Sequence, residues 1–89
     1  MQKYRLELTK RAMKDLAKLD KPTQALIVKW LQQILQDTAT PRGQGKALTG
    51  QLSHLWRYRV GNYRILAEIH DNTITIEVVK IGHRRDIYK

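Results

Sequence analysis

The sequence predicts an α+β fold in which a helical hairpin packs on a mainly antiparallel β-sheet. Apolar residues alternate at period two near the start of the chain and again over its second half. Between these stretches they recur at helical spacing, in two segments with a short joint. The chain has 89 residues, 42% of them hydrophobic, so we expect residues 1–89 to form one domain with a modest core. The order β-α-α-β-β-β is typical of an α+β protein.

The first predicted strand and helix follow each other closely. Tyr4, Leu6 and Leu8 alternate with charged residues, which indicates a strand with one buried face. Thr9 has the side chain of a helix N-cap, and the helix is expected to begin near Lys10. Its apolar stripe consists of Ala12, Leu16 and Leu19.

A second helix is predicted directly afterwards. Asp20 is a suitable N-cap, and Pro22 fits the first turn, where its missing N–H leaves no hydrogen bond unmade. The apolar stripe is the clearest in the chain and consists of Ile27, Trp30, Leu31, Ile34 and Leu35. Residues 37–50 contain Pro41 and several glycines, and we expect them to form an irregular loop.

The second half is predicted to form three strands joined by short turns at Gly61-Asn62 and Asp71-Asn72. These strands are residues 55–60, 63–70 and 73–81, and a short tail of residues 82–89 follows. Ile74, Ile76 and Val78 are expected in the core. The place of the first strand in the sheet stays open at this point.

Alternation assigns the two faces of the sheet. Trp56, Tyr58 and Val60 share one side, which we expect to face the helices. Arg57, Arg59 and Arg64 then project from the open face, unless a bulge changes the register. A single arginine in a strand is usually just a solvent-facing residue. Three on one face favour a binding role.

The charge distribution supports an anionic partner. The chain has 17 Lys and Arg against 8 Asp and Glu, a formal net charge of +9. Nucleic acid, an acidic protein and an anionic membrane are the candidate partners. Between Thr38 and Ala67 there is no acidic residue. Positive charge gathers in that stretch and in the tail, where the arginines suit bidentate phosphate contacts. Besides the three strand arginines, the basic residues of interest are Arg42, Lys46, Arg84 and Arg85.

Several classes of site are disfavoured. Cysteine is absent, so the chain forms no disulfide or thiolate metal site, which fits a reducing cytoplasm. The start has no apolar signal sequence, and no apolar run is long enough to span a membrane. His54, His70 and His83 are scattered without ligand spacing, so no metal or cofactor is expected. Glu68 is read as a structural partner of a neighbouring arginine. His83, beside arginines, has the right chemistry for proton transfer near neutral pH, although an exposed histidine is the default reading.

Two stretches resemble the RelE branch of the RelE/ParE toxin superfamily. They are Trp56-Arg57-Tyr58-Arg59-Val60-Gly61-Asn62-Tyr63-Arg64 and Ile81-Gly82-His83-Arg84-Arg85-Asp86-Ile87-Tyr88. The upstream Gly45-Lys46-Ala47-Leu48-Thr49-Gly50 and the order of elements also fit, so the likeness covers nearly the whole chain.

The resemblance implies a toxin of a type II toxin–antitoxin system with a fold similar to small microbial RNases. Such toxins cleave mRNA in the ribosomal A site without a metal, by attack of the ribose 2′-OH on the adjacent phosphate. The implied partners are a cognate acidic antitoxin, the ribosome and its mRNA, in the cytoplasm and not at a membrane. The toxin–antitoxin complex is expected to bind operator DNA through the antitoxin.

The resemblance also assigns roles to individual residues. Arg57 and Arg59 stand where some relatives have substrate-binding lysines, and Arg64 matches a phosphate-stabilising arginine. Arg84 matches an arginine that acts on the leaving group, and His83 stands where some relatives carry a catalytic histidine. Tyr88 matches a tyrosine that stacks on the mRNA base, although packing over the sheet edge is as good a reading from the sequence. Lys46, Arg42 and Arg85 are expected to contact RNA.

Arginine does not readily lose its proton, so Arg57 and Arg59 are poor general bases. His83 is then the best proton-transfer group, unless electrostatics and ribosomal positioning suffice. Two alternatives remain open. One is a ParE-like inhibitor of DNA gyrase, and the other is a non-catalytic module that binds RNA or protein.

Overall fold

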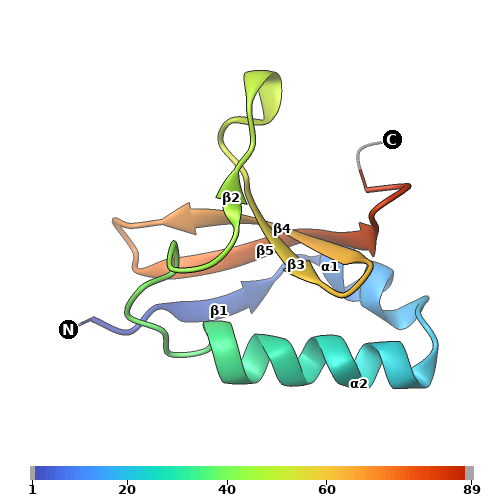
Figure 1. The fold of residues 1–89 in the computed structure, drawn as a ribbon. Coiled ribbons are helices and arrows are strands. Elements are labelled where there is room, and N and C mark those ends of the chain that lie inside the picture. The colour runs from blue at the N-terminus through green and yellow to red at the C-terminus, as the bar shows by residue number, and fades with distance from the viewer. Residues whose placement is uncertain (1, 88–89) are drawn as a thin grey trace.

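The computed structural model describes residues 2–87, and its elements follow the predicted order with additions (Figure 1). Strand β1 (Arg5–Leu8) leads into helices α1 (Lys10–Ala17) and α2 (Lys21–Trp30), and α2 continues as a π-helical turn, Leu31–Leu35. A short strand β2 (Lys46–Ala47) and a 3-10 turn (Gly50–Leu52) come next. The remaining strands are β3 (Trp56–Val60), β4 (Tyr63–His70) and β5 (Thr75–His83).

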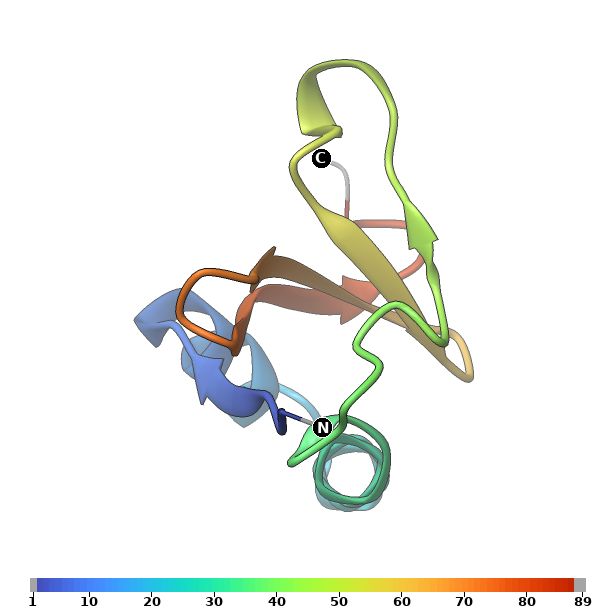
Figure 2. The ribbon, with the colours of Figure 1, turned by 90° about the vertical axis from the view of Figure 1, so that its left-hand side faces the viewer.

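The five strands form one sheet in the order β1-β5-β4-β3-β2. Strand β1 pairs with β5 in parallel, and all other pairs are antiparallel, which confirms a mainly antiparallel sheet and places the first strand at its edge. Both helices lie on one side of this sheet, as Figure 2 shows with α2 seen end-on. Within residues 2–87, no helix combines the length and the apolar character that crossing a bilayer requires.

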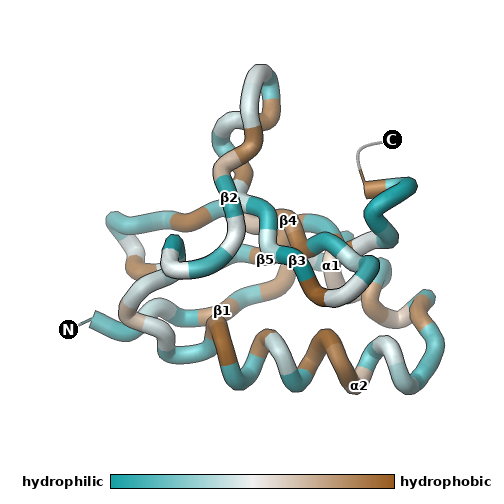
Figure 3. The backbone as a smooth tube through the Cα atoms, in the orientation of Figure 1, coloured by the Kyte–Doolittle hydropathy of each residue, from teal (hydrophilic) through white to brown (hydrophobic). Residues whose placement is uncertain are grey.

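The helix starts are those that the sequence predicts. The Thr9 side chain accepts a hydrogen bond from the Ala12 N–H at 3.1 Å, and Asp20 accepts one from Thr23 N–H at 3.2 Å. These side chains satisfy donors that the first turn of a helix leaves unpaired. Figure 3 shows hydrophobic and hydrophilic residues alternating along α2, whose apolar residues meet the sheet.

The main core lies between the helices and the sheet. Tyr58, Ile65 and Ile76 are fully buried there, with Trp56 and Val60 on the same face as predicted. Alternation predicted this face correctly because each of these strands has one side that packs in the main core and one side that is more polar. Ile74 is the exception. It lies in the β4–β5 turn with a φ of 51°, so its prediction as a core strand residue was wrong.

Strand β5 begins and ends two residues later than predicted. It starts only after the turn that contains Ile74, and it ends at His83, which pairs with Tyr63. Apolar alternation could not show this ending because Gly82 and His83 carry no apolar side chain. The short strand β2 was also missed, since two residues are too few to display a period.

A bulge in β5 is held by the N-terminal segment. The register shifts between Leu66 and Ala67, which pair with Lys80 and Val78 and leave Val79 extra. Where β1 ends, Thr9 donates its hydroxyl to the Val79 carbonyl, and a carboxylate oxygen of Asp15 accepts the Ile81 N–H at 3.0 Å. The N-cap and the first helix thereby supply hydrogen-bond partners for backbone groups of β5 that lie past the end of its pairing with β1.

The open face of the sheet carries a second, smaller apolar cluster. The segment between β2 and β3 and the tail after β5 both rise on the side away from the helices (Figures 1 and 2). Ile87 of the tail is 1% exposed and packs with Leu55 and Leu66. Leu48 and Val79 border this cluster. The tail is therefore held over the sheet by an apolar contact.

The buried Tyr58 side chain is expected to make the fold less stable at alkaline pH. Its side chain is fully buried and its hydroxyl donates to the Pro41 carbonyl, and burial raises its pKa to about 12 from the usual 10.0. The pKa of Tyr58 is higher in the folded protein than in the unfolded chain. The neutral phenol therefore stabilises the fold fully below pH 10, and this contribution is lost as the pH rises through the pKa of the folded state. We expect the midpoint of urea unfolding to fall between about pH 10 and pH 12 more steeply in wild type than in Tyr58→Phe. Equal slopes for the two proteins would contradict this.

Candidate functional site

Four basic side chains occupy neighbouring positions on the open face, and we call Lys46, Arg57, Arg59 and Arg64 the basic cluster. Arg57 pairs with Lys46 of β2 on one side and with Leu66 of β4 on the other. Arg59 pairs directly with Arg64. Directly opposed residues of antiparallel strands project from the same face, so two adjacent rows of the sheet converge on one basic surface.

Arg64 is far more enclosed than alternation suggested. It is only 8% exposed, and its Nη1 donates to the carbonyl oxygens of Gly61 and Tyr63 at 3.2 and 3.1 Å. Arg64 therefore lies on the expected face of the sheet but is enclosed there and not open to solvent. The β3–β4 turn holds the guanidinium in one orientation, which fixes its charge near Arg59. A preorganised cation of this kind stabilises developing negative charge without rearranging.

Arg57 offers an unused hydrogen-bond donor. Its Nε is shielded from solvent and has no partner among residues 2–87. Arg57 and Arg59 also line a hollow of about 250 Å³ at the edge of β3. The rest of the hollow is formed by Trp30, Gln44, Gly45 and Lys46. A buried donor without a partner is unfavourable by itself, and the guanidinium that carries it belongs to a residue of the hollow, where an anionic group would be favoured.

The loop before β2 is fastened against β3 beside this hollow. Trp56 Nε1 donates to the Gln44 carbonyl at 2.6 Å. Gly45 has a φ of 83°, and a Cβ built there would lie 2.2 Å from the Arg57 carbonyl oxygen. Only glycine fits this position, because the backbone is left-handed and passes directly against β3.

The tail turns back over the cluster side of the sheet. The Arg84 N–H donates to the Asn62 carbonyl at 2.9 Å, and the Ile87 N–H donates to the His83 carbonyl at 3.0 Å. Gly82 is the cross-strand partner of Arg64, and a Cβ on it would come within 3.1 Å of Ile87 Cδ1. The arginines of the tail, Arg84 and Arg85, are exposed. Tyr88, the expected stacking residue, lies outside the described residues.

His83 is not brought together with the basic cluster. It pairs with Tyr63, whose ring packs against the main core, and the two rings meet edge-on at 5.5 Å between centroids. The His83 side chain therefore lies on the helix side of the sheet, and its Nδ1 accepts the Arg85 N–H at 3.2 Å. A catalytic role for His83 stays a prediction that this placement does not favour.

Arg42 also lies apart from the cluster, beside the β4–β5 turn. It makes a bidentate ion pair with Asp71, whose Oδ1 also accepts the Tyr4 hydroxyl at 2.7 Å. The Arg42 guanidinium holds the pKa of the Asp71 carboxyl below its usual value. The pair ties the 38–45 loop to the turn, and any contact of Arg42 with RNA stays a prediction.

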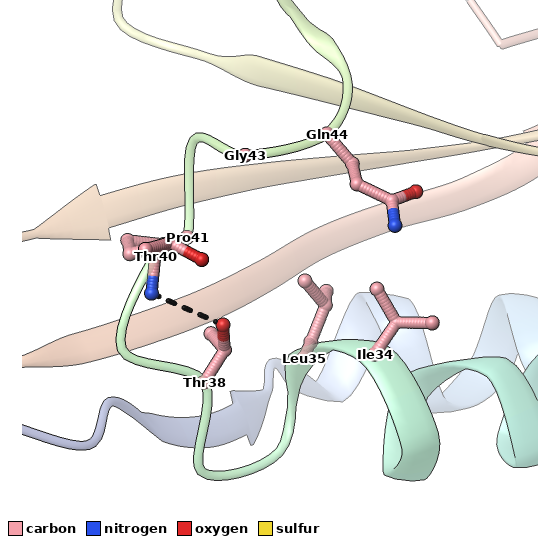
Figure 4. A pocket seen from close by; sticks show the side chains of 7 residues that line it. All are labelled: Ile34, Leu35, Thr38, Thr40, Pro41, Gly43 and Gln44. Carbon is pink, nitrogen blue, oxygen red and sulfur yellow. Dashed lines mark hydrogen bonds between the residues drawn. The ribbon is translucent and has the colours of Figure 1, made fainter.

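A separate hollow of about 180 Å³ lies under the same loop, over the end of the π-helical turn (Figure 4). Thr40 N–H donates to the Thr38 hydroxyl at 3.1 Å at its rim. The lining residues are Ile34, Leu35, Thr38, Thr40, Pro41, Gly43 and Gln44. None of these side chains is titratable, so the hollow supplies no acid–base chemistry.

Two groups on the open face were not anticipated. One is the apolar cluster in which Leu66 packs with Leu55 and Ile87. The other surrounds Glu68, whose ion-pair partners among residues 2–87 are His54 and His70 and not an arginine. The position of His54 along the chain did not indicate its contact with Glu68. The contact between Glu68 and His70, in contrast, was predictable, because residues two positions apart on a strand such as β4 project from the same face.

Comparisons with known proteins identify the family to which this fold belongs. The family described as ParE toxin of type II toxin–antitoxin system, parDE, matches residues 6–88. Toxin RelG of Mycobacterium tuberculosis is 33% identical over 86 residues, covering 97% of each chain. In the crystal structure of the M. tuberculosis toxin–antitoxin complex RelBE2, a chain of 30% identity has a TM-score of 0.82, with 97% of both chains covered.

The isolated E. coli RelE toxin is similar in fold alone, at 23% identity and a TM-score of 0.71, covering 90% of this chain and 83% of that one. The family match and the RelG likeness span nearly the whole chain, and the fold of two helices and a five-stranded sheet matches that of the RelE toxins. The protein therefore belongs to the RelE/ParE superfamily of type II toxin–antitoxin toxins.

Proposed function

We propose that this toxin is an mRNA endoribonuclease that cleaves codons in the ribosomal A site and so inhibits translation in the cytoplasm. The observation that carries the proposal is the basic cluster, two adjacent rows of cations on the open face with the tail folded back beside them. Relatives with RelE names share the fold.

The proposed reaction needs no metal. The ribose 2′-OH attacks the adjacent phosphate, which gives a cyclic phosphate and a free 5′-OH. Negative charge accumulates on the pentacoordinate phosphorus in the transition state, and fixed cations stabilise it. In this scheme Arg57 and Arg59 hold the phosphate and Arg64 stabilises the developing charge. Arg84 acts at the leaving oxygen, and Tyr88 would stack on the base.

Proton transfer is the step to which the cluster contributes least. Its arginines stay charged at neutral pH and cannot serve as a base. His83 lies on the other side of the sheet, facing Tyr63. We therefore propose that positioning on the ribosome and charge stabilisation supply most of the rate, and that His83→Ala retains much of it.

The proposed partners follow from the same surface. The relatives in the M. tuberculosis RelBE2 and E. coli RelBE structures are seen as toxin–antitoxin complexes. A cognate acidic antitoxin that covers the basic cluster would block RNA directly and would neutralise part of the +9 charge. Operator DNA would be bound through this antitoxin.

Primer extension on a defined mRNA tests the proposal, with programmed ribosomes and with naked RNA in parallel. We expect cuts within the A-site codon only when ribosomes are present. Cuts on naked RNA would keep the nuclease and remove the ribosome requirement. A folded protein that cuts under neither condition would overturn the proposal.

Binding to ribosomes is expected to weaken steeply with salt. Each phosphate that the basic cluster contacts releases counterions, so three or four contacts should lower the affinity by about 10-fold or more between 50 and 200 mM salt. Sedimentation with ribosomes at stepped KCl concentrations measures this. A flat response would argue against phosphate binding by this face.

A ParE-like action on DNA gyrase is the second candidate, because the matching family is described as ParE toxin. A supercoiling assay with purified gyrase distinguishes the two. Inhibition of supercoiling without mRNA cleavage would favour this candidate, and inactivity in both assays would favour a binding module.

A further inference from the structure

A group of histidines and glutamates lies on the open face near the β4–β5 turn, at the other end of β4 from Arg64. Glu68 of β4 and Glu77 of β5 are direct cross-strand partners. His70 lies two residues after Glu68 on the same strand and therefore projects from the same face. His54 reaches Glu68 from the segment between β2 and β3.

The side-chain N and O atoms of three of these residues lie close enough to share one metal ion. His70 Nε2 lies 3.2 Å from Glu77 Oε1 and 3.4 Å from Glu68 Oε2. The ligand atoms of these three residues all lie within 4.8 Å of one another. A tetrahedral Zn²⁺ with bonds of about 2.0–2.1 Å separates its ligands by roughly 3.3–3.4 Å. His54 Nε2 lies 4.0 Å from Glu68 Oε1, within reach of a fourth position after a small side-chain rotation.

The charge arrangement also calls for a cation. Like charges directly opposite each other destabilise a sheet, and Glu7 of β1 pairs with Glu77 in turn, so three carboxylates form one row. The ion-pair partners of Glu68 and Glu77 in the structure are histidines, in a chain with 17 Lys and Arg. A divalent ion bound here would neutralise two of these carboxylates at once.

We propose that Glu68, His70 and Glu77 bind one divalent transition-metal ion of the Zn²⁺ type, with His54 as the fourth ligand. Mixed imidazole and carboxylate ligands suit Zn²⁺ and exclude a dedicated Mg²⁺ site, which requires oxygen ligands. The side chains are between 34% and 59% exposed, so an ion can enter from solvent. This site is separate from the basic cluster and does not depend on the proposed RNA cleavage.

The bound ion would have a structural effect. His54 belongs to the segment that rises between β2 and β3, and the other three ligands belong to the paired strands β4 and β5. A shared ion would therefore fix that segment over the open face, beside Leu55 of the small apolar cluster.

Calorimetric titration of ZnCl₂ into the metal-free protein, together with thermal unfolding, tests the proposal. We expect one ion per chain and a midpoint raised by several degrees when Zn²⁺ exceeds its Kd, with no comparable effect of MgCl₂. Glu77→Gln and His70→Ala should each lower the Zn²⁺ affinity by at least about 10-fold. Without metal, Glu77→Gln should be as stable as wild type or more stable, because it removes a repulsion, so misfolding does not obscure the result.

His83→Ala is the matched control, since it removes a histidine on the other side of the sheet. It should keep the full affinity and the full shift of the midpoint. The absence of Zn²⁺ binding would overturn the proposal. So would Glu77→Gln and His70→Ala proteins that bind Zn²⁺ as tightly as wild type, or a His83→Ala protein that loses as much Zn²⁺ affinity as they do. In those cases the contacts of His70 with the two carboxylates would be the whole role of the group.

Discussion

Gly45→Ala is expected to destabilise the fold by about 2–5 kcal/mol, the sum of a left-handed backbone at about 1–2 kcal/mol and an overpacked contact at about 1–3 kcal/mol. The new Cβ would lie 2.2 Å from the Arg57 carbonyl oxygen and 2.7 Å from Trp56 Nε1. Neither neighbour can yield cheaply, because one is backbone in β3 and the other is fastened to the Gln44 carbonyl. Urea unfolding followed by circular dichroism measures the loss.

Gly50→Ala provides the control for this change. Gly50 also has a positive φ, 63°, yet a Cβ there meets nothing within 4 Å. This variant should show the backbone penalty alone, about 1–2 kcal/mol. Equal losses for the two variants would mean that the contact with β3 contributes nothing.

Arg64→Ala is expected to lower ribosome-dependent cleavage by about 10²–10³-fold, the usual effect of losing one preorganised charge-stabilising group. Since Arg64 is 8% exposed and bound to two carbonyl oxygens, a stability loss of about 1–3 kcal/mol should accompany it. Single-turnover cleavage by primer extension measures the first effect. Urea unfolding measures the second, and assays well below the unfolding midpoint keep them apart.

Arg5→Ala controls for the change of net charge. Arg5 is exposed on the edge strand β1, where its side chain donates a hydrogen bond to the Thr75 hydroxyl. Strand β1 lies at the opposite edge of the sheet from β2 and β3, which carry most of the basic cluster. Its loss removes the same unit of charge and should leave the cleavage rate within about 2-fold, as surface substitutions usually do. An Arg64→Ala protein that cleaves as fast as Arg5→Ala would remove Arg64 from the proposed mechanism.

The parts of the fold that local chemistry determines were predictable. Thr9 and Asp20 cap their helices as their side chains suggest. The faces of β3 and β4 follow from alternation, because a one-residue slip would expose the entire apolar set. The basic character of the open face followed from the same argument.

Long-range contacts decided what alternation could not. Arg64 is enclosed by carbonyl oxygens of the β3–β4 turn, which depend on the turn's conformation. His83 extends β5 and so falls on the helix side, because it pairs with Tyr63. Glu68 meets His54 of a loop, and His70 meets Glu77 of β5, and no local pattern encodes either distance.

The parallel pairing of β1 with β5 has a consequence for the order of folding. Arg5 and Thr75 are 70 positions apart in sequence, whereas β3, β4 and β5 are joined by tight turns. Closing so long a loop carries an entropic penalty that short hairpins avoid. The meander that carries Arg57, Arg59 and Arg64 can therefore assemble early, and β1 docks late. During synthesis, β1 emerges first but has no strand partner until β5 has left the ribosome.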